Sequence, residues 1–266
     1  MNRSVALAVL FACSTVGWTQ KTPTALPANP TDTKFTAIYT AEAAWQRAQR
    51  GDESPEDERR GRVQPHLPKV DPATQQAKLV FWTGILKQLD ELDPHQLSPA
   101  QLLNYKVYRA QIVVEMNEQK FREYEKPANS DSAFWSDEAG PATDPFKTEE
   151  NYRNYIARLN DTPRYFREQI ANMRAGLARG FTPPQVTLKG RDVSLRRIAE
   201  AKTPEASDYY KPFEKMPDSI PTETQAKLRA DAAAAIRDTS ALVGYNTTSG
   251  RRPTLPAAGD PRPRAP

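Results

Sequence analysis

Apolar residues recur every three to four positions along most of the chain, and this spacing predicts α-helices. The clearest stretch is 73–93, where one stripe carries Leu79, Trp82, Ile85, Leu86, Leu89 and Leu92. In 99–121 the spacing predicts an inward-facing stripe made of Leu102, Leu103, Val107, Ala110, Val113 or Val114, Asn117 and Phe121. Similar stripes predict helices around Phe35, Tyr152, Tyr165 and Leu228.

Capping patterns divide these helical stretches from one another. Ser98 precedes Pro99, and Gln101 follows three residues after the serine, which is a helix-start pattern. Thr148 is a second expected cap, and Thr162-Pro163 predicts that one helix ends there and another begins. Gly180 is the expected stop of that second helix, and later starts are expected at Asp192 and Thr222.

The expected fold class is therefore all-α, an irregular multi-helix array with long loops and disordered N- and C-terminal ends. The best candidate for a strand is Gln185–Leu188. The expected divisions are a signal peptide at 1–19, a Pro/Thr-rich spacer at 20–33, a helical portion at 34–243 and a disordered Arg/Pro-rich tail at 244–266.

The charge distribution argues against nucleic acid as a partner. The 266 residues carry a formal net charge of +4 at pH 7. Residues 4–250 contain equal numbers of basic and acidic side chains, so the excess lies at Arg3 and in the last sixteen residues. A nucleic-acid face would need a local basic patch, and no long Lys/Arg run supplies one.

The N-terminus predicts export. Arg3 precedes an apolar run from Val5 to Ala12 that is too short to span a membrane, which is the layout of a signal peptide. The expected location is the periplasm. The single cysteine, Cys13, follows Leu10-Phe11-Ala12 and gives an alternative, a lipoprotein whose lipid anchor is attached to Cys13.

The sequence offers no recognisable catalytic or metal-binding residues. His66 and His95 are the two histidines, and their separation does not match the i, i+4 spacing of zinc ligands on a helix. No H-E-x-x-H, G-x-S-x-G or glycine-rich phosphate loop occurs. No cofactor is therefore expected in this chain.

The stretch 121–135 combines polar turn residues with aromatic ones in a long predicted loop. Long loops of this kind are often functional, so Asn129, Ser130, Asp131 and Trp135 are candidate cleft-lining residues. The alternative is a self-capping turn, in which Asn129, Ser130 and Asp131 satisfy backbone N–H groups while Phe134 and Trp135 pin the loop to the core.

Three long segments carry a resemblance to a known family. LSPAQLLNYKVYRAQ, FREYEKPANSDSAFW and NYRNYIARLNDTPRYFREQIANMRAGLARGFTPPQVTLKGRDVSL lie in a fixed order. Together they resemble the N-terminal part of the bacterial exported family called domain of unknown function 885, over roughly 35–240.

That resemblance implies a zinc-metallopeptidase-like protein about twice this length, with an H-E-x-x-H helix in its later half. Zinc and a peptide or small-molecule substrate are then expected in full-length relatives. This chain is expected to be a truncated helical half, inactive alone, because its ending departs from the family pattern. The alternative function is a non-catalytic periplasmic binding or interaction module.

Overall fold

The computed structural model describes residues 29–50, 63–142 and 144–248, and within them all regular structure is helical. The all-α prediction is therefore confirmed for these residues. The longer helices are α1 (Pro30–Arg50), α3 (Pro72–Asp90), α4 (Pro99–Phe121), α5 (Glu149–Ala178) and α9 (Thr222–Thr248). Shorter α-helices are α6 (Gln185–Leu188), α7 (Asp192–Ala199) and α8 (Lys211–Glu214). The 3₁₀ turns are η1 (Pro94–Gln96), η2 (Glu123–Glu125), η3 (Pro204–Ala206) and η4 (Asp208–Tyr210).

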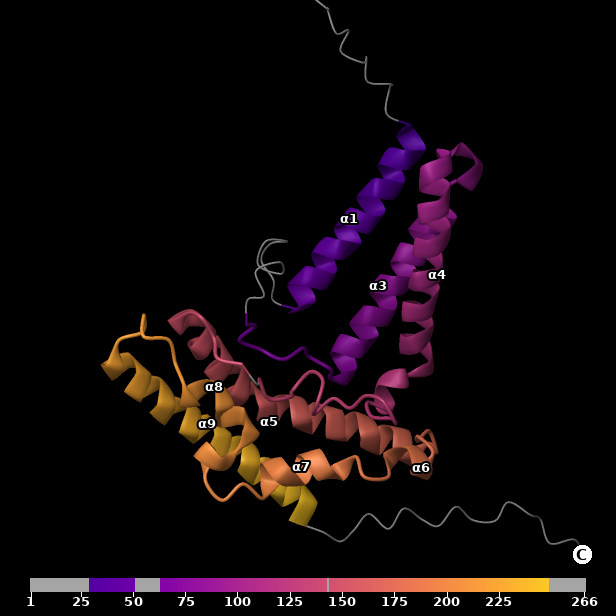
Figure 1. The fold of residues 1–266 in the computed structure, drawn as a ribbon. Helices are drawn as coiled ribbons and strands as arrows, with labels where there is room; N and C mark the ends of the chain where they lie inside the picture. Colours follow the sequence, from indigo (N-terminus) through magenta and orange to yellow (C-terminus); the bar gives the residue numbers. More distant parts are fainter. Residues whose placement is uncertain (1–28, 51–62, 143, 249–266) are drawn as a thin grey trace, which may run out of the picture.

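Figure 1 shows α1, α3 and α4 standing together on one side of α5, with α7, α8 and α9 on its other side. Each side has its own apolar core, because each group of helices buries its own stripe. The core of the three-helix unit contains Phe35, Trp82, Leu89, Tyr105 and Ile112. The core around α5 and α9 contains Tyr152, Leu159, Tyr165, Phe213 and Leu228.

The two units meet at the open end of the α3–α4 hairpin, where α3 begins and α4 ends (Figure 1). Residues 63–71 run beneath α5 and lead directly into α3, whose first turn is capped by Asp71. Just after the end of α4, buried Glu125 in η2 forms an ion pair with Arg179, which lies just past α5. Phe181 packs beneath the side chains of Lys126 and Arg179. Gly176 lets this junction close, because a Cβ there would lie 2.9 Å from the carbonyl oxygens of Glu125 and Phe181.

The buried face of α4 differs from the sequence prediction. Tyr105 and Ile112 are buried, whereas the predicted core residues Leu103, Val107, Val114 and Phe121 are 53–64% exposed. The helix carries two apolar faces, and aromatic contacts from Phe35 to Tyr105 and Tyr108 show which of them packs inward. The predicted helix is confirmed, but the stripe predicted to face the core is the exposed one.

Helix α5 continues through Thr162-Pro163, which corrects the predicted break. Proline has no N–H and its ring crowds the carbonyl four residues earlier, here that of Leu159. The Thr239 hydroxyl of α9 shares its single proton between that carbonyl, at 3.2 Å, and the Ala235 carbonyl of its own helix, at 3.0 Å, and both Thr239 and Leu159 are buried. A side chain from a distant part of the chain therefore replaces the missing backbone donor.

The other helix boundaries agree with the sequence prediction or differ from it by a few residues. Ser98 and Thr148 cap α4 and α5 as predicted. Gln185–Leu188 is one helical turn, so the strand prediction is wrong; such a short apolar run does not distinguish the two structures. Helix α1 begins at Pro30, inside the predicted spacer, and α9 extends to Thr248, inside the predicted tail. The predicted signal peptide, Cys13 and the rest of the tail lie outside the described residues.

Candidate functional site

The candidate loop residues form a compact turn. The Asn129 side-chain oxygen accepts hydrogen bonds from the N–H groups of Asp131 at 2.7 Å and Ser132 at 2.9 Å. Ser130 and Asp131 lie exposed at the tip. Trp135 is buried, and its ring N–H donates to the Ser194 hydroxyl at 3.0 Å. These contacts resemble the self-capping alternative, and a cleft-lining role for the four residues stays a prediction.

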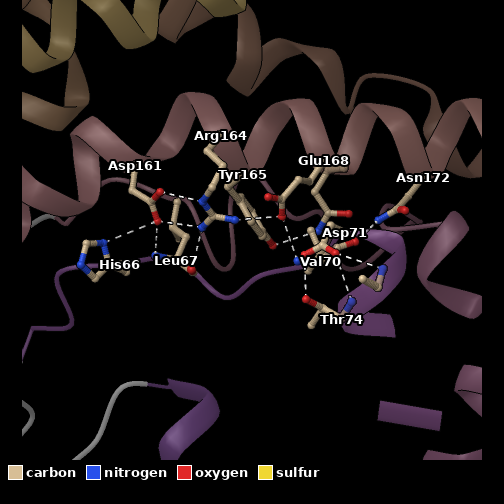
Figure 2. A network of polar contacts seen from close by, with 12 residues as sticks. His66, Leu67, Val70, Asp71, Thr74, Asp161, Arg164, Tyr165, Glu168 and Asn172 are labelled. Atoms are coloured by element: carbon tan, nitrogen blue, oxygen red, sulfur yellow. Dashed lines mark hydrogen bonds and ion pairs between the residues drawn. The ribbon is translucent and has the colours of Figure 1, made fainter. Parts of the chain in front are cut away.

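A row of polar side chains on α5 holds the extended segment 63–71 (Figure 2). The Asp161 carboxylate accepts from the Leu67 N–H at 2.8 Å, and Arg164 donates to the Leu67 carbonyl at 2.8 Å. One turn further on, Glu168 accepts from the Val70 N–H at 2.9 Å. Asn172 donates to the Val70 carbonyl at 2.8 Å. The row thus forms hydrogen bonds with the N–H and the carbonyl of both Leu67 and Val70.

Charges within this row support one another. Arg164 bridges Asp161 at 2.7 Å and Glu168 at 2.8 Å. Burial alone would raise the pKa of Asp161, but hydrogen bonds from Arg164 and the Leu67 N–H hold it below its usual value. His66 lies 3.9 Å from the same carboxylate. Because the partners are backbone groups of the same chain, the row has a structural role in anchoring the segment that leads into α3.

The outer face of α4 is the second unusual surface. Its apolar residues Leu103, Val107, Val114 and Phe121 are exposed and follow one side of the helix. Between them is a shallow hollow of about 440 Å³, lined by Val107, Ala110, Gln111, Val114 and Glu115. Figure 1 places α4 at the outer edge of the three-helix unit. The residues of α4 that pack against α1 and α3 are others, among them Tyr105 and Ile112. We call this exposed side of α4, with Leu103, Val107, Ala110, Val114 and Phe121, the α4 outer face.

Carboxylates border the α4 outer face on one side. Burial is the main cause that raises the pKa of Glu115, and the nearby carboxylates of Glu118 and Glu42 raise it further. Lys78 of α3 acts in the opposite direction on Glu115. Burial also lowers the pKa of Lys78. Glu115 and the exposed Glu118 make this edge acidic, whereas Glu42 is buried on α1.

The described residues do not fit a zinc site. Among them, no group of three His, Cys, Asp or Glu side chains is placed to hold a metal ion. His66 belongs to the segment held by α5. The backbone N–H of His95 in η1 donates to the Asp93 carboxylate, which caps this turn. No helix within the described ranges is both long and apolar enough to cross a membrane.

Sequence reasoning missed both surfaces. The spacing of Asp161, Arg164 and Glu168 at i, i+3 and i+7 was a signal for a polar row on one helix face. Its partner, the segment with Pro65 and Pro68, lies about a hundred residues earlier, and sequence alone gives no register between them. The α4 outer face is an apolar stripe in the sequence, but its helical spacing is the same as that of a core-facing stripe.

Comparison with known proteins identifies a family. No curated protein and no solved structure matches the chain. A family model described as "bacterial protein of unknown function (DUF885)" matches residues 51–258. Since this match covers well over half of the chain, the protein belongs to the DUF885 family of bacterial proteins.

Proposed function

We propose that this chain is a non-catalytic helical interaction module, exported to the periplasm, that binds a protein partner through the α4 outer face. The observation that carries the proposal is the row of apolar side chains at Leu103, Val107, Val114 and Phe121. Exposed apolar residues are usual when scattered singly, whereas a contiguous row marks an interaction surface. Export rests on the apolar run Val5–Ala12 behind Arg3.

A second candidate is the helical part of a zinc-dependent hydrolase. It is favoured by the resemblance of the three long segments to a family whose longer members carry an H-E-x-x-H helix. In that case zinc and the peptide or small-molecule substrate would be held by residues other than those described here. This chain would supply a scaffold and would be inactive alone.

Two measurements on the full chain separate these functions. The first is the zinc content of the purified protein together with its hydrolysis of a peptide library, with and without a chelator. We expect neither bound zinc nor turnover; stoichiometric zinc with chelator-sensitive hydrolysis would overturn the proposal.

The second measurement is photo-crosslinking in the producing bacterium from a benzophenone amino acid at position 107. The matched control is position 186, because Val186 is 79% exposed but lies on α6. We expect a defined crosslinked product from position 107 and none from position 186. Equal labelling from both positions, or none from either, would contradict an interaction role for α4.

A further inference from the structure

The α4 outer face has the spacing of one half of a coiled-coil contact. Its central positions are separated alternately by four and three residues, namely 103, 107, 110, 114, 117 and 121. This average of 3.5 residues keeps a stripe facing a single partner helix over several turns. The buried side of α4, with Tyr105, Ile112 and Met116, contacts α1 and α3 instead. One helix therefore has an occupied face and an unoccupied seam among the described residues.

The hollow has the shape that such a partner requires. Val107, Ala110, Gln111 and Val114 stand at i, i+3, i+4 and i+7, which is the set of four residues that surrounds a knob in coiled-coil packing. Ala110 supplies only a methyl group at the centre of this set, so the space of about 440 Å³ stays open. A branched apolar side chain from a facing helix would enter it between Val107 and Val114.

The charges along the seam define the partner further. Glu115 lines the hollow itself, and Glu118 is exposed one turn away on the same edge. Buried Glu42 of α1 and Lys78 of α3 act on Glu115 in opposite directions, so Glu115 and Glu118 are the groups that make this edge negative. A lysine or arginine on the partner's flank would therefore be attracted to this edge.

We propose that the occupant of the α4 outer face is an amphipathic helix of a second protein, with apolar residues at heptad spacing and basic residues facing Glu115 and Glu118. The proposal rests on the proposed function, since it names the partner of the same surface. The exposed apolar side chains each offer on the order of 100 Å² to such a helix. With the same area of the partner helix, these four side chains would bury on the order of 800 Å² in total, which is the size of a weak, transient contact.

A second copy of this chain fits less well than a different helix. In a parallel pair, the side chain facing the hollow would be Ala110 of the other copy, which is too small to fill it. In an antiparallel pair, each flank of the stripe lies against the same flank of the other copy. Lys106 of one copy would therefore face Lys120 of the other. Like charges in such positions oppose association.

The test uses two fluorescently labelled peptides and the full-length protein. Both peptides are helices of four heptads with Leu at the two apolar positions of each heptad. They differ along one flank, where the first carries Lys and the second carries Gln. Fluorescence anisotropy at nanomolar peptide measures the dissociation constant for each. We expect the Lys peptide to bind about three- to ten-fold more tightly, because each exposed ion pair contributes about 0.2–1 kcal/mol.

Protein variants locate the contact. Val107→Glu should weaken binding of the Lys peptide by about ten-fold or more, because it places a charge at the rim of the hollow. Val186→Glu, on α6, should leave binding unchanged. In Glu115→Gln/Glu118→Gln the two peptides should bind equally. Circular dichroism and urea unfolding confirm that each variant is folded, which is expected because these side chains are not in the core.

Several results would overturn the proposal. These are failure of the Lys peptide to bind, equal binding of both peptides by the wild-type protein, or no effect of Val107→Glu. A concentration-dependent dimer lost in Val107→Glu would identify a second copy as the occupant. Crosslinking from position 107 without peptide binding would leave the interaction module standing and refute only the helical partner, whereas failure of both assays would refute the module as well.

Discussion

Thr239→Val should destabilise the protein more than the loss of one hydroxyl normally does. The Thr239 hydroxyl shares its single proton between the Leu159 carbonyl, at 3.2 Å, and the Ala235 carbonyl, at 3.0 Å, and Pro163 cannot supply the N–H that the Leu159 carbonyl would otherwise receive. Valine has nearly the same shape, so the main effect is a buried carbonyl without a partner, which costs about 1–3 kcal/mol. The Ala235 carbonyl, which also accepts from Thr239, keeps its helical N–H donor. Urea unfolding should show a lower midpoint with an unchanged slope.

Two control substitutions test whether the cost comes from the unpaired Leu159 carbonyl. Thr162→Val removes a hydroxyl that donates to the Arg158 carbonyl at 3.0 Å, but that carbonyl keeps the Thr162 N–H, so the cost should stay below about 1 kcal/mol. Pro163→Ala restores an N–H for Leu159. In that background Thr239→Val should cost at least about 1 kcal/mol less than in the wild type. Equal costs of Thr239→Val in both backgrounds would refute the reasoning.

Three further predictions follow from the packing and the charges. Gly176→Ala should lower the free energy of unfolding by about 1–3 kcal/mol, since its Cβ would lie 2.9 Å from two carbonyl oxygens. Gly84→Ala, with no atom within 4 Å, should raise it by about 0.5–1 kcal/mol in the same urea assay. A lower stability of the Gly84 variant would contradict this contrast. Ile112→Ala should cost about 2–5 kcal/mol and Val107→Ala less than about 0.5 kcal/mol, because Ile112 is 2% and Val107 53% exposed. The reverse order would mean that the predicted stripe faces the core after all. The lowered pKa of Asp161 means that its contribution to stability is present above the pKa of the unfolded chain, near 3.9, and is lost as the pH falls below that value. Asp161→Asn should therefore be less stable at pH 7 and show a smaller loss between pH 7 and pH 3 in urea midpoints, and an unchanged pH dependence would contradict the assigned contacts.

Local signals in the sequence were sufficient for the helices and several of their ends. Ser98 and Thr148 work as caps because capping depends only on neighbouring backbone N–H groups. The fold class followed from the 3.6-residue spacing, which is also local. The continuation of α5 through Pro163 was not predictable in this way, because its compensation comes from Thr239, far along the chain.

The candidate surfaces were harder to predict for the same physical reason. Helix α4 carries two apolar stripes, and only contacts from α1 and α3 decide which of them is covered. The polar row of Asp161, Arg164 and Glu168 has a recognisable spacing, but its backbone partners at Leu67 and Val70 cannot be assigned without the tertiary structure. Asn129, in contrast, bonds within its own turn, as its residue type allows.

The most direct test of the α4 outer face as a helix-binding surface is to fill its hollow. Ala110→Phe places a ring at the centre of the set formed by Val107, Gln111 and Val114, on the exposed side of the helix. Fluorescence anisotropy with the Lys-flanked peptide would compare this variant with the wild type. The expected result is normal urea unfolding with an affinity at least about ten-fold weaker, since the partner's side chain no longer enters. A folded Ala110→Phe protein that binds the peptide as tightly as the wild type would contradict the assignment.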